Sequence, residues 1–128
     1  MHHFSVKNLR VCFESLDGKK AVGIDGVTKE QYGEALEDNL QRLYQKLHQL
    51  SYCPQAVRRV EIPKEDGSTH PLGISCVEDK IIQAMTRRLL EAIYEPKFLD
   101  TSYGFRAGWS CHDALRQLNQ EMMRRPVH

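Results

Sequence analysis

Apolar residues recur at three- and four-residue steps along much of this chain, which is the period of a helix with one buried face. The first such stretch runs from Val6 to Leu16, with Ser5 in the N-cap position. Asp17-Gly18 is predicted to end this helix, and a loop over residues 19–27 follows it. The chain therefore opens with a capped amphipathic helix and a glycine-containing connection.

The longest helix is predicted next. Thr28–Gln31 has the form of a capping box, and an apolar stripe, mostly leucine, runs from Tyr32 to Leu50. Acidic and amide side chains occupy the opposite face, as expected of a solvated surface. Pro54 interrupts the pattern, because the residue before a proline is biased away from helical backbone.

The period changes to two residues over positions of about 57–74, which predicts an antiparallel hairpin. Val60 and Ile62 alternate with polar residues, and Leu72 and Ile74 repeat this spacing on the return strand. Asp66-Gly67 supplies the turn, because glycine adopts a positive φ without a Cβ penalty. We expect one face of this hairpin to be buried.

Two further helices are predicted after the hairpin. The first opens at a capping box over Ser75–Glu78, carries an apolar face from Val77 to Ile93, and cannot continue past Pro96. The second is capped by Ser110 and ended by Pro126. Its inner face is expected to hold Ala114, Leu115, Leu118 and Met122.

These elements describe an α+β domain that is mainly helical, with a short hairpin between the helices. A length of 128 residues fits a single domain with a real core, but not a polymerase. No apolar run is long enough to cross a membrane, and no signal peptide is present, so we expect no membrane partner.

Charge and cysteine content change this picture only a little. The formal net charge is +1, so the chain lacks the basic excess that usually marks a nucleic-acid-binding domain. The four cysteines lack the spacing of a metal site, which favours free thiols in a cytoplasmic protein. They are Cys12, Cys53, Cys76 and Cys111.

Three ordered motifs resemble reverse transcriptases, most closely those encoded by group II introns, also called maturases. The first is similar to the N-terminal extension loop of that family, the second to its first fingers motif, and the third to its second fingers motif. They are Gly23–Thr28; Ile62-Pro63-Lys64 with the Asp66-Gly67 turn, Pro71–Ile74 and Glu78-Asp79-Lys80; and Tyr103–Gly108. The resemblance covers residues of about 21–115.

The resemblance implies one fingers subdomain over residues 1–128. Residues of about 1–56 would form its N-terminal extension, and residues of about 57–128 would carry the hairpin and the fingers helices. The palm, thumb and maturase domains of the family are expected to be absent. In the parent protein, this region would help to position template RNA and the incoming nucleotide.

Two residues at the hairpin are implied to contact the incoming deoxynucleotide. They are Lys64 and His70, which would lie at the triphosphate. The family pattern has arginine where this chain has His70. A histidine is mostly neutral at pH 7 and cannot make a bidentate phosphate contact, so we expect the hold on the nucleotide to be weakened.

Template RNA or intron RNA is implied as the second partner. The predicted contacts are Gly23, Asp25, Gly26, Arg58, Arg59, Tyr103, Phe105 and Arg106. Aromatic side chains beside an arginine can hold a nucleic-acid strand, although such aromatics also pin loops to a core. The loop around Asp25 has a similar alternative, as an ordinary connection between helices that Asp25 braces.

Nucleotide polymerisation needs metal ions held by carboxylates, and the family places these in an aromatic-x-Asp-Asp turn of the palm. The sequence has no Asp-Asp pair, so we expect no catalytic residue, no resident metal and no activity from this chain alone. Mg²⁺ is expected only in the full-length RNA-directed DNA polymerase.

Other classes of function stay open. The chain could be a non-catalytic module that binds intron RNA and aids splicing, or a protein-interaction domain without a nucleic-acid role, which the balanced charge favours. The apolar residues of the final helix would be exposed if the palm is missing, so we also expect a homodimer formed through them.

Overall fold

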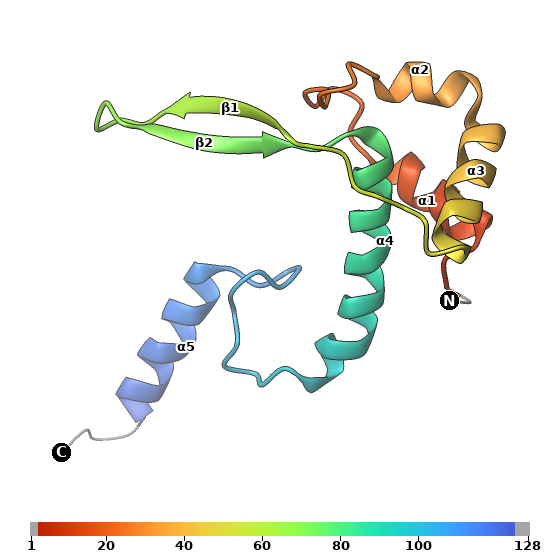
Figure 1. The fold of residues 1–128 in the computed structure, drawn as a ribbon. Coiled ribbons are helices and arrows are strands. Elements are labelled where there is room, and N and C mark those ends of the chain that lie inside the picture. Colours follow the sequence, from red (N-terminus) through yellow and green to blue (C-terminus); the bar gives the residue numbers. More distant parts are fainter. Residues whose placement is uncertain (1–2, 125–128) are drawn as a thin grey trace. The chain divides into compact units, whose positions relative to one another are not determined.

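The computed structural model describes residues 3–124 and divides the chain into two compact units, one up to Leu90 and one from Glu91 onward. The elements are α1 (Val6–Ser15), α2 (Lys29–Glu34), α3 (Leu36–His48), β1 (Arg58–Pro63), β2 (Thr69–Ile74), α4 (Val77–Tyr94), the short 3-10 helix η1 (Glu95–Lys97) and α5 (Cys111–Arg124). Helices with one antiparallel hairpin confirm the predicted α+β fold class (Figure 1). Within residues 3–124, no helix combines the length and the apolar character needed to cross a membrane.

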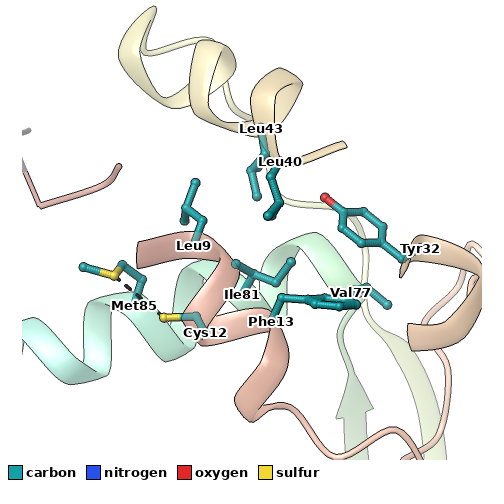
Figure 2. Close-up of a cluster of buried hydrophobic side chains, with 9 residues drawn as sticks. All are labelled: Leu9, Cys12, Phe13, Tyr32, Leu40, Leu43, Val77, Ile81 and Met85. Carbon is teal, nitrogen blue, oxygen red and sulfur yellow. Dashed lines mark hydrogen bonds between the residues drawn. The ribbon is translucent and has the colours of Figure 1, made fainter. Parts of the chain in front are cut away.

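The core of the first unit lies where α1, α2, α3 and α4 meet (Figure 2). Its members are Leu9, Cys12, Phe13, Tyr32, Leu40, Leu43, Val77, Ile81 and Met85. The Cys12 Sγ atom lies 3.7 Å from the Met85 Sδ atom. Burial raises the pKa of the Cys12 thiol, and the nearby Arg88 charge opposes this shift in part. Cys12 therefore behaves as a small core residue, and all four cysteines are free thiols.

The prediction of one long helix after Thr28 is wrong, because the chain breaks between α2 and α3. Ala35 has φ −119° and ψ 42°, outside the helical region. The break leaves the Tyr32 carbonyl without its usual helical partner, and the Asn39 side-chain amide donates to it at 2.8 Å. Tyr32 and the leucines of α3 can then reach the same core from two helices, and the longest helix is α4 instead.

Two leucines of the predicted apolar stripe differ in burial. Leu43 of α3 is fully buried, whereas Leu50 lies past the end of the helix with its side chain 79% exposed. The backbone of Leu50 is left-handed, with φ 54°, so the chain turns away from the core at this position. The predicted capping box over Thr28–Gln31 is confirmed.

The hairpin is confirmed, and in Figure 1 it extends away from α1, α2 and α3. Val60 pairs with Leu72 and Ile62 pairs with His70, so the apolar side chains share one face. The expectation that this face is buried is wrong towards the turn, where Ile62 is 43% and Leu72 is 42% exposed. The reason is that the two-stranded ribbon extends beyond the helices of the first unit, so none of these helices covers its apolar face near the turn.

The start of α4 also differs from the prediction. The first helical hydrogen bond runs from the Lys80 N–H to the Cys76 carbonyl, so Cys76 takes the N-cap position that the sequence assigned to Ser75. The Ser75 hydroxyl instead accepts a hydrogen bond from Gln83 at 3.4 Å. Val77, Ile81 and Met85 are buried as predicted, but Ile93 is exposed.

Helix α5 has the predicted cap but no buried face. The Asp113 N–H donates to the Ser110 hydroxyl at 3.3 Å, and the Ser110 N–H donates to the Asp113 carboxylate at 2.9 Å, which is a reciprocal capping arrangement. None of the described α5 residues is buried, so the predicted inner face is wrong. Leu115, Leu118 and Met122 are exposed, and the homodimer expected from them stays a prediction. Pro126, predicted to end this helix, lies outside the described residues.

Candidate nucleic-acid interface

The tip of the hairpin brings Lys64 and His70 onto one face. His70 pairs with Ile62, and Lys64 follows Ile62 by two residues, so strand alternation directs both basic side chains to the same side. Both residues are exposed. This geometry agrees with two neighbouring contacts to one anionic ligand, and it leaves the predicted triphosphate role a prediction.

The turn that holds these two residues is well defined. Gly67 has φ +80°, and the Lys64 N–H donates to the Ser68 carbonyl at 2.8 Å. The Asp66 carboxylate accepts from the Ser68 hydroxyl at 2.6 Å and from the Ser68 N–H at 2.9 Å. These two hydrogen bonds, the hydroxyl first, hold the pKa of Asp66 below its usual value, so the charged form that braces the turn persists at neutral pH.

Arg58 and Arg59 lie on opposite faces of β1. The Arg58 Nε atom donates to the Val22 carbonyl at 3.0 Å, which ties the base of the hairpin to the loop after α1. Arg59 forms an exposed ion pair with Glu61, with Nε 2.7 Å from Oε1. Because an exposed pair of this kind contributes little, it is easily exchanged for another anion. Only Arg58 shares the face of Lys64 and His70.

The loop with Gly23, Asp25 and Gly26 has clear local reasons for its sequence. A Cβ at Gly23 would lie 2.7 Å from the Cα and Sγ atoms of Cys76, so this backbone packs directly onto the start of α4. The Asp25 carboxylate accepts from the Val27 N–H at 3.2 Å, and Gly26 has φ +70°. These contacts agree with the alternative in which Asp25 braces a connection, and they leave the RNA contacts of this loop a prediction.

Replacing Gly23 with alanine is expected to lower the free energy of unfolding by about 1–3 kcal/mol, because the new methyl group would overlap the backbone of Cys76. Gly104→Ala is the matched control, since a Cβ there meets no heavy atom within 4 Å. Urea denaturation followed by circular dichroism gives both values. Equal midpoints for the two variants would mean that the loop can move away from α4 at no cost.

Three consecutive charged residues at the start of α4 each bind a different segment of the first unit. The Glu78 carboxylate accepts from the Tyr32 hydroxyl at 3.4 Å. The Asp79 carboxylate accepts from the Tyr52 hydroxyl at 2.5 Å and from the Gln55 N–H at 3.3 Å. The Lys80 ammonium donates to the Ala21 carbonyl at 2.8 Å. Side chains of successive helical residues point about 100° apart, so three consecutive residues can contact three different segments around the helix.

Asp79 is the member that the sequence interpretation missed. It is buried, and it fastens the segment that leads into β1 to the helix that follows β2. Burial first, and then the hydrogen bond to Asp79, raise the pKa of the Tyr52 phenol. Helical periodicity puts Asp79 opposite the face of Val77 and Ile81, so the apolar pattern does not predict its burial. The only available signal was its place in the Glu78-Asp79-Lys80 motif.

In the second unit, the donors of Arg106 are satisfied internally. Its Nε and Nη2 atoms donate to the Glu95 carboxylate at 3.0 and 2.8 Å, and Nη1 donates to the carbonyls of Leu99 and Ser102 at 3.2 and 2.9 Å. The guanidinium also lies over Trp109, 4.2 Å from the ring centroid. The Arg106 side chain is only 8% exposed, so this arrangement does not favour the predicted RNA contact.

The two predicted aromatic contacts of this loop differ from each other. The Tyr103 hydroxyl donates to the Gln117 side chain, and its ring meets Trp109 edge-on at 5.0 Å, so Tyr103 pins the loop to α5. Phe105 has the opposite environment, with a completely exposed ring and a left-handed backbone at φ 59°. Of the two, only Phe105 is presented to solvent.

The predicted contact residues therefore fall into two groups, one in each unit. The hairpin and the loop after α1 belong to the first unit, and Tyr103, Phe105 and Arg106 belong to the second. Among residues 3–124, no group of three or more histidine, cysteine, aspartate or glutamate side chains could hold a metal ion.

Known proteins similar to this chain include two whose names refer to introns. The chain is 38% identical over 112 residues to "Group II intron-encoded protein LtrA" of Lactococcus lactis subsp. cremoris, which covers 87% of this chain and 19% of that protein. It is 38% identical over 108 residues to "Protein YkfC" of Escherichia coli (strain K12), covering 84% of this chain and 28% of that protein. It is also 42% identical over 81 residues to "Uncharacterized 91 kDa protein in cob intron" of Schizosaccharomyces pombe, covering 63% of this chain and 10% of that protein.

The chain thus spans about a fifth of the length of the first of these relatives. No protein-family model matches it.

Proposed function

Because this chain belongs to the group II intron-encoded proteins, of which it matches one part, we propose that it is the N-terminal fingers region of a reverse transcriptase of that class. Its role in the full protein is to position template RNA or intron RNA and the incoming deoxynucleotide. The observation that carries this proposal is the 38% identity to an intron-encoded protein across 87% of the chain. A non-catalytic role in binding intron RNA draws on the same similarity.

The hairpin supports the positioning role on physical grounds. Cations near a phosphate offset its negative charge, and Lys64 and His70 stand exposed on one face of a ribbon that extends from the helices (Figure 1). The Asp66–Ser68 hydrogen bonds hold the turn, and the Asp79 contacts hold the segment that leads into β1. Hydrogen bonds therefore hold both the turn next to Lys64 and the segment that leads into the hairpin.

Binding of a structured RNA across a range of salt concentrations tests the proposal. We expect association that weakens as salt rises, because phosphate contacts release bound counterions. Lys64→Ala is expected to reduce the slope of log affinity against log salt by about 0.7–0.9 for one lost phosphate contact. Lys7→Ala, a change to an exposed lysine on α1, is the control and should leave the slope unchanged.

Two results would contradict the proposal. Absence of RNA binding at low salt would favour the protein-interaction alternative, which the balanced net charge of +1 also allows. Equal slopes for Lys64→Ala and Lys7→Ala would move the phosphate contacts away from the hairpin tip.

A further inference from the structure

Phe105 occupies an unusual position for a large apolar residue. Its side chain is fully exposed, and its backbone has φ 59°, in the left-handed region that a residue with a Cβ rarely adopts. Such a conformation persists only where the surrounding structure holds it, and it often marks a site of function. The ring is therefore held out into solvent by its neighbours.

The neighbour that holds it is Arg106. Its Nη1 atom binds the carbonyls of Leu99 and Ser102, which precede Phe105, and its guanidinium lies against Trp109, which follows it. The Trp109 N–H closes a turn by donating to the Arg106 carbonyl at 3.3 Å. The loop is thus fixed on both sides of Phe105 by groups that leave the Phe105 ring itself untouched.

We propose that Phe105 is the RNA-contacting residue of this loop and stacks on an unpaired nucleobase, and that Arg106 is a positioning residue that acts through Phe105. This inference rests on the proposed function, because the relation to intron-encoded proteins is what makes RNA the partner. It replaces the expectation that Tyr103, Phe105 and Arg106 all contact RNA together.

A stacked base matches the size of this contact. A single aromatic side chain offers about 150–250 Å² of surface to bury. One stacked base is a complete contact of that size, and the ring tolerates any base because every base has a π face. The Arg106 side chain is 8% exposed and bonded to Glu95, so its guanidinium is not available to bind a phosphate.

The test uses the full 128-residue chain and a single-stranded RNA oligomer that carries 2-aminopurine, a fluorescent base whose emission falls on stacking. Phe105→Ala is expected to weaken binding about 5- to 150-fold and to remove the quenching. Phe105→Trp should keep both, because it keeps a stacking ring. The salt slope should stay unchanged, since no charge is lost. Leu99→Ala, which changes a 74% exposed residue of the same loop, is the control.

Trp109, the single tryptophan of the chain, reports on the loop itself. Phe105→Ala should leave its fluorescence in the free protein unchanged, whereas Arg106→Ala should alter it. If Arg106 acts through Phe105, Arg106→Ala weakens RNA binding in the parent chain but causes no further loss in the Phe105→Ala background.

Each of the other outcomes would contradict a specific part of the proposal. If the parent binds RNA and Phe105→Ala binds equally well, the stacking role is wrong and the proposed function stands. If the parent binds no RNA, both fail. If Arg106→Ala causes the same loss with and without Phe105, Arg106 does not act as its positioning residue.

Discussion

Leu43→Ala is expected to lower the free energy of unfolding by about 2–5 kcal/mol, one of the two largest effects that we predict for a single substitution in this chain. The Leu43 side chain is completely buried between α3 and the other core helices (Figure 2). Alanine removes its apolar contacts and leaves a cavity that the neighbouring side chains fill only in part. Because small domains are typically stable by only about 5–15 kcal/mol, this is a large fraction of the total. Urea denaturation followed by far-ultraviolet circular dichroism measures it.

Leu50→Ala is the matched control for this prediction. It removes the same atoms from the same predicted stripe, but Leu50 is 79% exposed, so its effect should stay within about 0.5 kcal/mol. Similar losses at the two positions would mean that α3 continues to Leu50 and that the chain does not leave the core after His48.

Asp79→Ala is expected to lower the free energy of unfolding by about 2–4 kcal/mol, because it removes a buried acceptor that two donors share. The Tyr52 hydroxyl and the Gln55 N–H would lose their partner at this partly buried site. Amide hydrogen exchange at Gln55 should also become faster, since this N–H fastens the segment before β1 to α4.

Two comparisons isolate the contribution of Asp79. Tyr52→Phe removes one of its two hydrogen bonds and should cost about 1–2 kcal/mol, with a measurable coupling energy in the double variant. Glu65→Ala changes an exposed acid in the hairpin turn and should have little effect. A loss for Asp79→Ala no larger than that for Glu65→Ala would contradict the assignment of Asp79 as a buried anchor.

The local signals in the sequence predicted local structure well. Ser5 caps α1, and Thr28 with Gln31 forms the predicted capping box. Asp66-Gly67 makes the hairpin turn, and Ser110 caps α5 together with Asp113. In each case the donor and the acceptor lie within about three residues of each other, so the pattern of residues contains the whole interaction.

The relation to group II intron-encoded proteins was likewise visible in the ordered motifs, and the similarity to known proteins confirms it. The motifs did not predict which contacts each of their residues makes in the folded chain. Arg106 satisfies its donors within its own loop, and Asp79 is buried under a segment more than twenty positions away. A motif records which residues stand together in the chain, but not which of them still face solvent after folding.

The sequence by itself determined most of the helices, the hairpin and its turn, and the caps at Ser5, Thr28 and Ser110, because short-range hydrogen bonds and hydrophobic periods decide these features. Its ordered motifs indicated the family. Only the tertiary structure decided that the predicted long helix breaks at Ala35, that Leu43 is buried while Leu50 is exposed, and that Phe105 rather than Arg106 faces solvent. These outcomes depend on which surfaces the folded chain brings together. Periodicity marks a face as apolar, but burial depends on whether another segment covers that face.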